Sequence, residues 1–213
     1  MKGLLYFLII VLSLCATSIC VAQENPKYHG IVFFITGAPF PSDHPMIKPA
    51  LDNIKQFMQA KHPEAFFQII HNSKWKKIMQ EIRDLRKENG EDQQVIIMGH
   101  SYGAQAAVNI ARKFVKENVK INVIMTFDTI RKFFDKDPEL ISDNVDVNFN
   151  FFETKDLLLR GHRHNHRFDG STRGISNTKV PGPFKHWPHH EMVMKLTDAG
   201  VIYGILESAL NTF

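Results

Sequence analysis

Two patterns of apolar and polar residues alternate along this chain. Short, nearly continuous apolar runs rich in Ile, Val, Phe and Met are separated by longer segments in which apolar residues recur every three or four positions. The short runs predict buried strands, and the longer segments predict amphipathic helices. The expected strands are 31–36, 66–70, 94–98, 121–127, a segment at 145–152 in which apolar and polar residues alternate, and a short last one at 178–180. The expected helices carry apolar stripes over 47–58, 75–85, 107–115 and 192–209.

Mostly apolar strands separated by helices predict an α/β fold. We expect a three-layer sandwich with a mostly parallel sheet of about six strands, covered by helices on both faces. No linker or internal repeat interrupts residues 23–213, which indicates a single domain. The connections are too short for a large helical cap, and the aperiodic segment 157–185 is the one candidate for a lid.

The N-terminus has the pattern of a secretory signal peptide. Lys2 precedes a nearly unbroken apolar run over 4–14, and Cys20-Val21-Ala22 gives a small-x-small cleavage site. We expect cleavage after Ala22, giving a secreted or periplasmic protein with no stable membrane span. A retained membrane anchor is the alternative, since the apolar run approaches the length that spans a bilayer. Both cysteines lie within 1–22, so the remaining chain would be held by its core without disulfides.

Charge adds little to this description. The formal net charge is +4 and falls by one when Lys2 is removed, while the lysines and arginines are scattered along helix faces. This balance does not favour nucleic-acid binding, which usually needs a concentrated basic surface.

The segment Gly99-His100-Ser101-Tyr102-Gly103 carries the strongest chemical signal. It follows a predicted buried strand and precedes a predicted helix. A G-x-S-x-G sequence in this position is typical of a turn so sharp that it exposes a nucleophilic serine at the carboxyl end of a strand. Glycines flank the serine because side chains there would collide with the neighbouring strand and helix. Ser101 is therefore the candidate nucleophile.

On these residues the chain resembles the α/β-hydrolase superfamily, with a pattern similar to lipase- and esterase-like serine hydrolases. Besides the motif at Ser101, it has Thr126-Phe127-Asp128 after the next strand and histidines near its end. This is the family's order of serine, acid and histidine. The resemblance implies cleavage of an acyl ester or thioester, from a small-molecule or lipid substrate, through a covalent acyl-enzyme. No cofactor is required.

The serine needs a base, and the resemblance places it just before the final helix. His189 is the first choice, because an apolar residue, here Met192, often stands three positions after the family's histidine. His190 and His186 are the alternatives. Histidine accepts the proton of the hydroxyl, which is a poor nucleophile without such help.

An acidic residue must hold the imidazole in the required tautomer. Asp128 directly follows a strand, as in the Leu-Asp-Pro pattern of related enzymes, although Thr129 here replaces the proline. Asp156, after the next strand, is the alternative acid. Asp128 could instead cap a helix, and Asp156 could be a solvated loop charge.

Two backbone N–H groups are expected to stabilise the oxyanion. One belongs to Tyr102, directly after the serine. The other is assigned to Ala38, in the loop after the first strand, because Pro39 has no N–H. His100, beside the nucleophile, is expected to be a packing residue.

Histidine alternates with cationic or polar residues in the segment 162–166. Such spacing could hold a Zn²⁺ or Cu²⁺ ion, or it could form a flap that becomes cationic at acidic pH, and we favour the flap. Two other functions remain open for the whole chain. It could be a hydrolase-like domain that binds a partner without turnover, or a peptidase or acyltransferase that uses the same triad. The sequence does not specify an oligomeric state.

Overall fold

The computed structural model describes residues 28–37, 45, 47–130, 137, 139–154, 161–182 and 188–211. The predicted signal peptide lies outside them. A six-stranded sheet forms the centre, with strand order β2-β1-β3-β4-β6-β8 and every neighbouring pair parallel. Its strands are β1 (Gly30–Thr36), β2 (Ala65–His71), β3 (Gln94–His100), β4 (Ile121–Phe127), β6 (Val145–Phe152) and β8 (Ile175–Lys179).

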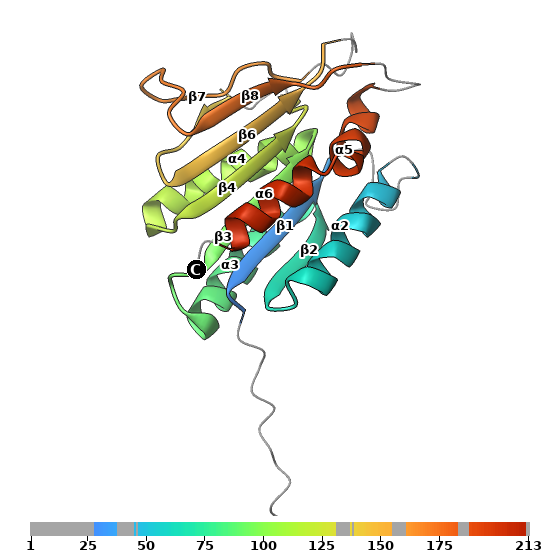
Figure 1. Cartoon of the computed structure of the whole chain (residues 1–213). Coiled ribbons are helices and arrows are strands. Elements are labelled where there is room, and N and C mark those ends of the chain that lie inside the picture. The colour runs from blue at the N-terminus through green and yellow to red at the C-terminus, as the bar shows by residue number, and fades with distance from the viewer. Residues whose placement is uncertain are drawn as a thin grey trace, which may run out of the picture.

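Helices cover both faces of the sheet (Figure 1). In this view α2 (Lys48–Lys61), α5 (Pro188–Asp198) and α6 (Val201–Leu210) lie in front, while α3 (Trp75–Asn89) and α4 (Tyr102–Phe114) lie behind. Single 3₁₀ turns, η1 (Asn72–Lys74) and η2 (Val115–Glu117), precede α3 and follow α4. Each face of the sheet packs its own apolar cluster against its helices. The expected three-layer sandwich is confirmed, and the sheet is parallel throughout.

The two central strands, β1 and β3, show why the sheet could be predicted from apolar runs in the sequence. All residues of β1 and β3 are buried, because these strands have neighbours on both sides and helices on both faces. Their continuous apolar runs follow from that position. No helix in the described residues is long and apolar enough to cross a membrane.

The end of the chain differs from the expectation of one helix beginning near Met192. Two helices form instead, separated at Gly200, whose φ of 73° is left-handed and interrupts the helix. The first helix, α5, starts at Pro188, where a proline's fixed φ and missing N–H suit the first turn. His189 and His190 therefore lie in the first turn of α5 rather than in a loop before it. The last strand also begins three residues earlier than expected, at Ile175.

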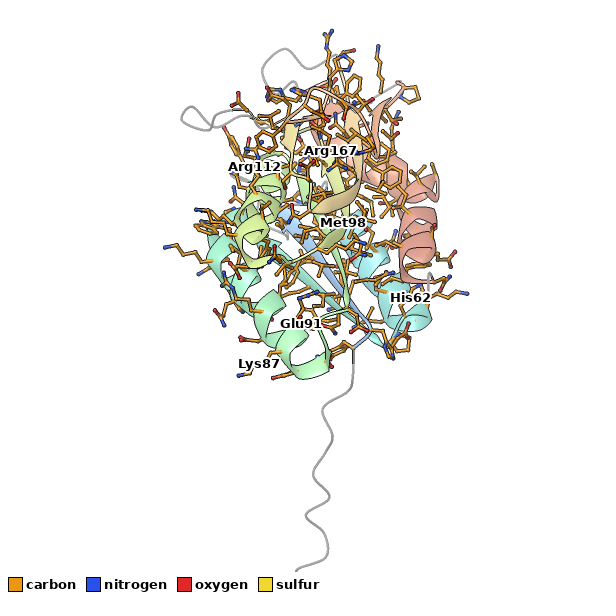
Figure 2. The ribbon with its side chains drawn as sticks, turned by 90° about the vertical axis from the view of Figure 1, so that its left-hand side faces the viewer. His62, Lys87, Glu91, Met98, Arg112 and Arg167 are labelled. Atoms are coloured by element: carbon orange, nitrogen blue, oxygen red, sulfur yellow. The ribbon has the colours of Figure 1, made fainter. Side chains whose placement is uncertain are left out.

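A second, smaller sheet was not anticipated. It pairs β5 (Leu140–Ile141) with β7 (His166–Arg167). Arg167, labelled in Figure 2, is almost fully buried and donates to main-chain carbonyls: its Nη1 lies 2.7 Å from Ser142 O and its Nη2 2.8 Å from Val145 O. Five donors in a rigid fork let one guanidinium bind several carbonyls. Arg167 thus fastens the segment after residue 161 to the start of β6.

Candidate active site

The turn from β3 into α4, residues Gly99–Gly103, holds Ser101 in a strained conformation. Ser101 has φ 60° and ψ −124°, which non-glycine residues rarely adopt. The two glycines make the turn possible. A Cβ on Gly103 would lie 2.0 Å from Ile35 O, and one on Gly99 would lie 2.4 Å from Gly103 O. Strain that the surrounding backbone enforces is typical of functional sites.

The end of β1 meets this turn directly. A Cβ on Gly37 would lie 2.8 Å from the Cβ of Ser101 and 2.9 Å from the backbone N of Tyr102. Gly37 thus lets the chain pass against the serine at the N-terminus of α4, where the peptide dipoles favour negative charge. Ala38, the other predicted oxyanion donor, follows Gly37 and lies outside the described residues. Tyr102 is the first residue of α4.

An aspartate and a histidine meet beside the elbow turn. His189 Nδ1 lies 2.8 Å from Asp128 Oδ2, although the two residues are 61 positions apart. Both side chains are buried, with 1% and 0% of their surfaces exposed. Asp128 lies beside the elbow turn because it follows β4, the neighbour of β3, and the carboxyl ends of parallel strands share one edge of the sheet. His189 reaches it from the first turn of α5.

The chain around Asp128 is built to hold its carboxylate. Its φ is 50°, so a second strained residue stands at the end of a neighbouring strand. Its Oδ1 accepts hydrogen bonds from the backbone N–H groups of Glu153 (3.1 Å) and Gly161 (3.2 Å). Only glycine fits the second position, since a Cβ on Gly161 would lie 2.3 Å from Oδ1. Burial raises the pKa of Asp128 above its usual value, against the opposing effect of the hydrogen bond from His189.

The second nitrogen of the same histidine is positioned for proton transfer. His189 Nε2 is buried and has no hydrogen-bond partner among the described residues. Because Asp128 Oδ2 is an acceptor, it favours the tautomer that carries hydrogen on Nδ1, and Nε2 then has a free lone pair. A nitrogen in this state can accept a proton from a hydroxyl brought within reach.

Two more imidazoles surround His189. The ring of His100 packs against it with centroids 4.6 Å apart, and that of His190 stands perpendicular to it at 5.1 Å. His100 Nε2 also lies 2.8 Å from the carbonyl oxygen of His189. A carbonyl only accepts, so His100 must carry hydrogen on Nε2. His100 therefore connects the elbow turn to the main chain of α5, which is more than the packing role expected of it.

A network of buried amides fixes the segment that supplies Gly161. Asn165 Nδ2 donates to Asn148 Oδ1 at 2.8 Å and to Thr126 Oγ1 at 3.3 Å. Asn150 Nδ2 donates to Asn177 Oδ1 at 2.9 Å and to the carbonyl of His162 at 3.1 Å. These bonds join the segment to β4, β6 and β8, so the Gly161 N–H is held at the carboxylate. Polar residues inside the buried strand β6 were the signal that could have revealed this network.

The histidines at 162–166 lie in different surroundings. His162 Nδ1 is 3.7 Å from Glu139 Oε2, while the ring of His164 lies 6.2 Å from that of Phe152. Among the residues that the structure describes, no group of three or more His, Cys, Asp or Glu side chains could hold a metal ion.

Of the residues selected from sequence, the structure brings together Asp128 and His189 beside the turn that carries Ser101. His190 is the next residue of the same helix turn. The alternatives His186 and Asp156 lie outside the described residues. No role was predicted for Gly161 or for the backbone of Glu153, whose N–H groups both donate to the carboxylate of Asp128.

No family model and no curated protein matches this sequence, but solved structures do. The type II thioesterase YbtT, from the yersiniabactin NRPS/PKS biosynthetic pathway, aligns with a TM-score of 0.50 and 8% identity, over 87% of this chain and 94% of that chain. Est1E from Butyrivibrio proteoclasticus, solved with ferulic acid, aligns with a TM-score of 0.49 and 10% identity, over 88% and 92%.

Aspergillus fumigatus lipase B aligns with a TM-score of 0.48 and 10% identity, over 71% of this chain and 44% of the lipase. This chain therefore spans less than half the length of that protein. At such low identity, the likeness to these enzymes is one of fold. The chain has the α/β-hydrolase fold, as the motif around Ser101 indicated.

Proposed function

We propose that this protein is an exported serine hydrolase that cleaves an acyl ester or thioester. The observation that supports this most directly is the buried pair of His189 and Asp128 beside the strained serine turn, in which Nε2 has no partner among the described residues. A buried carboxylate on one nitrogen and an available lone pair on the other are what general-base activation of a serine requires.

In the proposed reaction, Ser101 Oγ attacks the carbonyl carbon while its proton passes to His189 Nε2. Asp128 stabilises the imidazolium that forms, and the N–H groups of Tyr102 and Ala38 bind the oxyanion. The leaving group then takes the proton from Nε2 and departs, which leaves Ser101 acylated. Water, deprotonated by Nε2, attacks the acyl-enzyme; as the acid is released, Nε2 returns the proton to Ser101 Oγ, so the enzyme is regenerated with no cofactor.

Residues 1–22 are proposed as the signal that exports the chain to a periplasm or outside the cell. Expression of the full chain followed by N-terminal sequencing of the exported product tests this, with Gln23 expected as the first residue. A product that keeps its N-terminus in the membrane fraction would support the anchor instead.

The test of the chemistry is covalent labelling of the protein with a fluorophosphonate. The parent should react and form an adduct on Ser101, whereas Ser101→Ala should not react. His189→Ala should label at least about 10³-fold more slowly, because the hydroxyl loses its base. His190→Ala is the matched control, a neighbouring buried imidazole of the same helix turn. An adduct on another residue, or equal loss in both histidine variants, would contradict the proposal.

A further inference from the structure

A groove runs along α4 away from the serine turn, between this helix and the start of α3. It consists of two hollows of about 460 and 600 Å³ that share Trp75, Arg112 and Lys113. The first hollow begins at Tyr102, the residue after the candidate nucleophile. We call the two together the α3–α4 groove. One end of the groove is therefore one residue away from Ser101 along the chain.

The far end of the groove is cationic. Its wall includes Lys76, Lys113 and Lys116, which are exposed and form no ion pair with a described residue. Arg83 is neutralised by Glu117, with Nη2 and Oε1 2.7 Å apart. The positive charge of the three lysines is therefore left to attract an anion.

The ring of Trp75 lies close to the ammonium groups of two of these lysines. Lys113 Nζ lies 4.9 Å and Lys76 Nζ 5.7 Å from the centre of its ring. Ammonium groups are attracted to the face of an indole. Two cations that would otherwise spread into solvent thus stay near one half-buried ring, and they form a local site of positive charge.

The wall between the serine and these lysines combines polar and apolar side chains. Asn72, Gln105 and Asn109 line it together with Ala106 and Ile110. Such a wall can contact both the methylene groups and the polar atoms of a linear chain that joins an ester at the serine to an anion at the lysines.

From these contacts we infer that the substrate carries a phosphate, sulfate or carboxylate group remote from its scissile ester, bound at Lys76 and Lys113. Tyr102 and Lys113 are eleven residues apart on α4, so the anion lies about 16 Å from the elbow turn along the helix axis. This inference rests on the proposed hydrolysis at Ser101 and names the chemical class of its substrate.

Two pairs of synthetic esters test it, one for each side of the scissile bond. The first pair is p-nitrophenyl esters of a linear acid that ends, about 16 Å from the ester carbonyl, in a carboxylate or in a primary amide. The second pair is acetate esters of a linear polyether alcohol of the same length that ends in a phosphate or in a hydroxyl. The measured quantity is the ratio of kcat/KM between the anionic and the neutral ester of each pair.

In the parent, the anionic ester of at least one pair should be preferred by about five- to tenfold at low salt. The preference should shrink as NaCl is added, because both lysines are exposed and screened. The double variant Lys76→Glu, Lys113→Glu should abolish or reverse it. The matched control is Lys55→Glu, Lys87→Glu, which makes the same change in net charge at exposed positions outside the groove, on α2 and at the end of α3. In Figure 2, Lys87 is labelled near the lower end of the coloured ribbon and Arg112 of the groove in its upper half.

The two proposals fail in different ways. Turnover of the neutral esters without preference in either pair contradicts the substrate class alone. An equal loss of preference in the control double variant also contradicts it, because it would assign the effect to net charge rather than to the groove. If the parent hydrolyses none of the four esters, the proposed function fails, and the substrate assignment fails with it.

Discussion

The two sides of the candidate site are built by different means. The elbow turn, Gly99–Gly103, is local: five consecutive residues fix its shape, and backbone atoms of β1 and α4 leave no space for a Cβ at either glycine. The acid–base side, by contrast, gathers Asp128, Gly161 and His189 from three distant segments. Hydrogen bonds between buried polar groups hold it together. We call the two regions the elbow turn and the acid–base side.

The difference has a physical consequence. Backbone atoms close to Gly99 and Gly103 leave no space for a larger side chain, so the elbow turn should tolerate almost no substitution at its glycines. Because this steric exclusion involves no proton or hydrogen-bond partner, the shape of the turn should not depend on pH. A polar network depends on every donor and acceptor, and loss of one partner leaves another buried and unsatisfied. The acid–base side should therefore respond to single polar substitutions and to protonation.

The largest expected effect comes from the acid–base side. Asp128→Asn keeps the shape of the side chain but replaces the carboxylate that holds hydrogen on His189 Nδ1. We expect kcat/KM for p-nitrophenyl acetate to fall about 10³- to 10⁴-fold. Asp143→Asn, at an exposed loop position, should leave it unchanged. A loss below tenfold would mean that another acid, such as Asp156, fills the role.

The same variant tests the charge state of the buried carboxyl. Burial raises the pKa of Asp128 in the folded protein, whereas in the unfolded chain it should be about 3.9. At a pH between the unfolded and the folded pKa of Asp128, this carboxyl is ionised in the unfolded chain but still protonated in the folded one. The free energy of unfolding of the parent therefore falls as pH rises through this range. The free energy of unfolding of the parent minus that of Asp128→Asn should therefore decrease from about pH 4 upward. Urea denaturation of both proteins across this pH range measures the difference. An increase of the difference with pH would show that folding lowers the pKa of Asp128 instead of raising it.

The elbow turn should give the next largest effect, on stability. In Gly103→Ala the new methyl group would lie 2.0 Å from Ile35 O, a backbone atom of a central strand that cannot move aside. We expect the free energy of unfolding to drop by about 3 kcal/mol or more. Gly204→Ala is the control, because no atom lies within 4 Å of its Cβ position in α6. That substitution should stabilise the protein by about 0.5–1 kcal/mol. Thermal denaturation compares the two.

This contrast also explains what could be predicted from the sequence. Apolar runs predicted β1, β3 and β4 almost to the residue, because buried parallel strands are mostly continuous in apolar residues. The alternation of apolar and polar residues predicted β6. The motif at Ser101 was visible for the same local reason. The acid–base side was harder to predict, because its residues are far apart in the sequence. Nothing in the residues around Gly161 indicates that backbone N–H groups meet at the carboxylate of Asp128. The start of α5 was missed since Pro188 was not taken as a first helical residue.

A smaller effect is expected within the polar network. Asn165→Ala removes the donors to Asn148 Oδ1 and Thr126 Oγ1 and leaves both oxygens buried. The free energy of unfolding should fall by about 2 kcal/mol, as read from urea denaturation. Ser176→Ala, on the exposed edge of β8, should change it by less than about 0.5 kcal/mol. Equal effects of the two substitutions would show that the buried amides contribute nothing specific.

The smallest effect belongs to His100, which connects the two regions. It is part of the elbow turn, yet its Nε2 hydrogen-bonds the carbonyl of His189 at 2.8 Å. In His100→Ala we expect kcat for p-nitrophenyl acetate to fall about tenfold with little change in KM, because α5 would hold His189 less firmly. A tenfold loss corresponds to about 1.4 kcal/mol, the size of one neutral hydrogen bond.

His100→Gln provides the decisive comparison. Its amide can donate to the same carbonyl without an imidazole, so it should recover most of the rate if the hydrogen bond is what matters. If Gln and Ala are equally slow, the ring contact with His189, with centroids 4.6 Å apart, is the more important one. A fall in the free energy of unfolding that matches the fall in rate would instead make His100 a purely structural residue. In the first case, the sterically fixed elbow turn helps to position His189 through the hydrogen bond between His100 Nε2 and the carbonyl of His189.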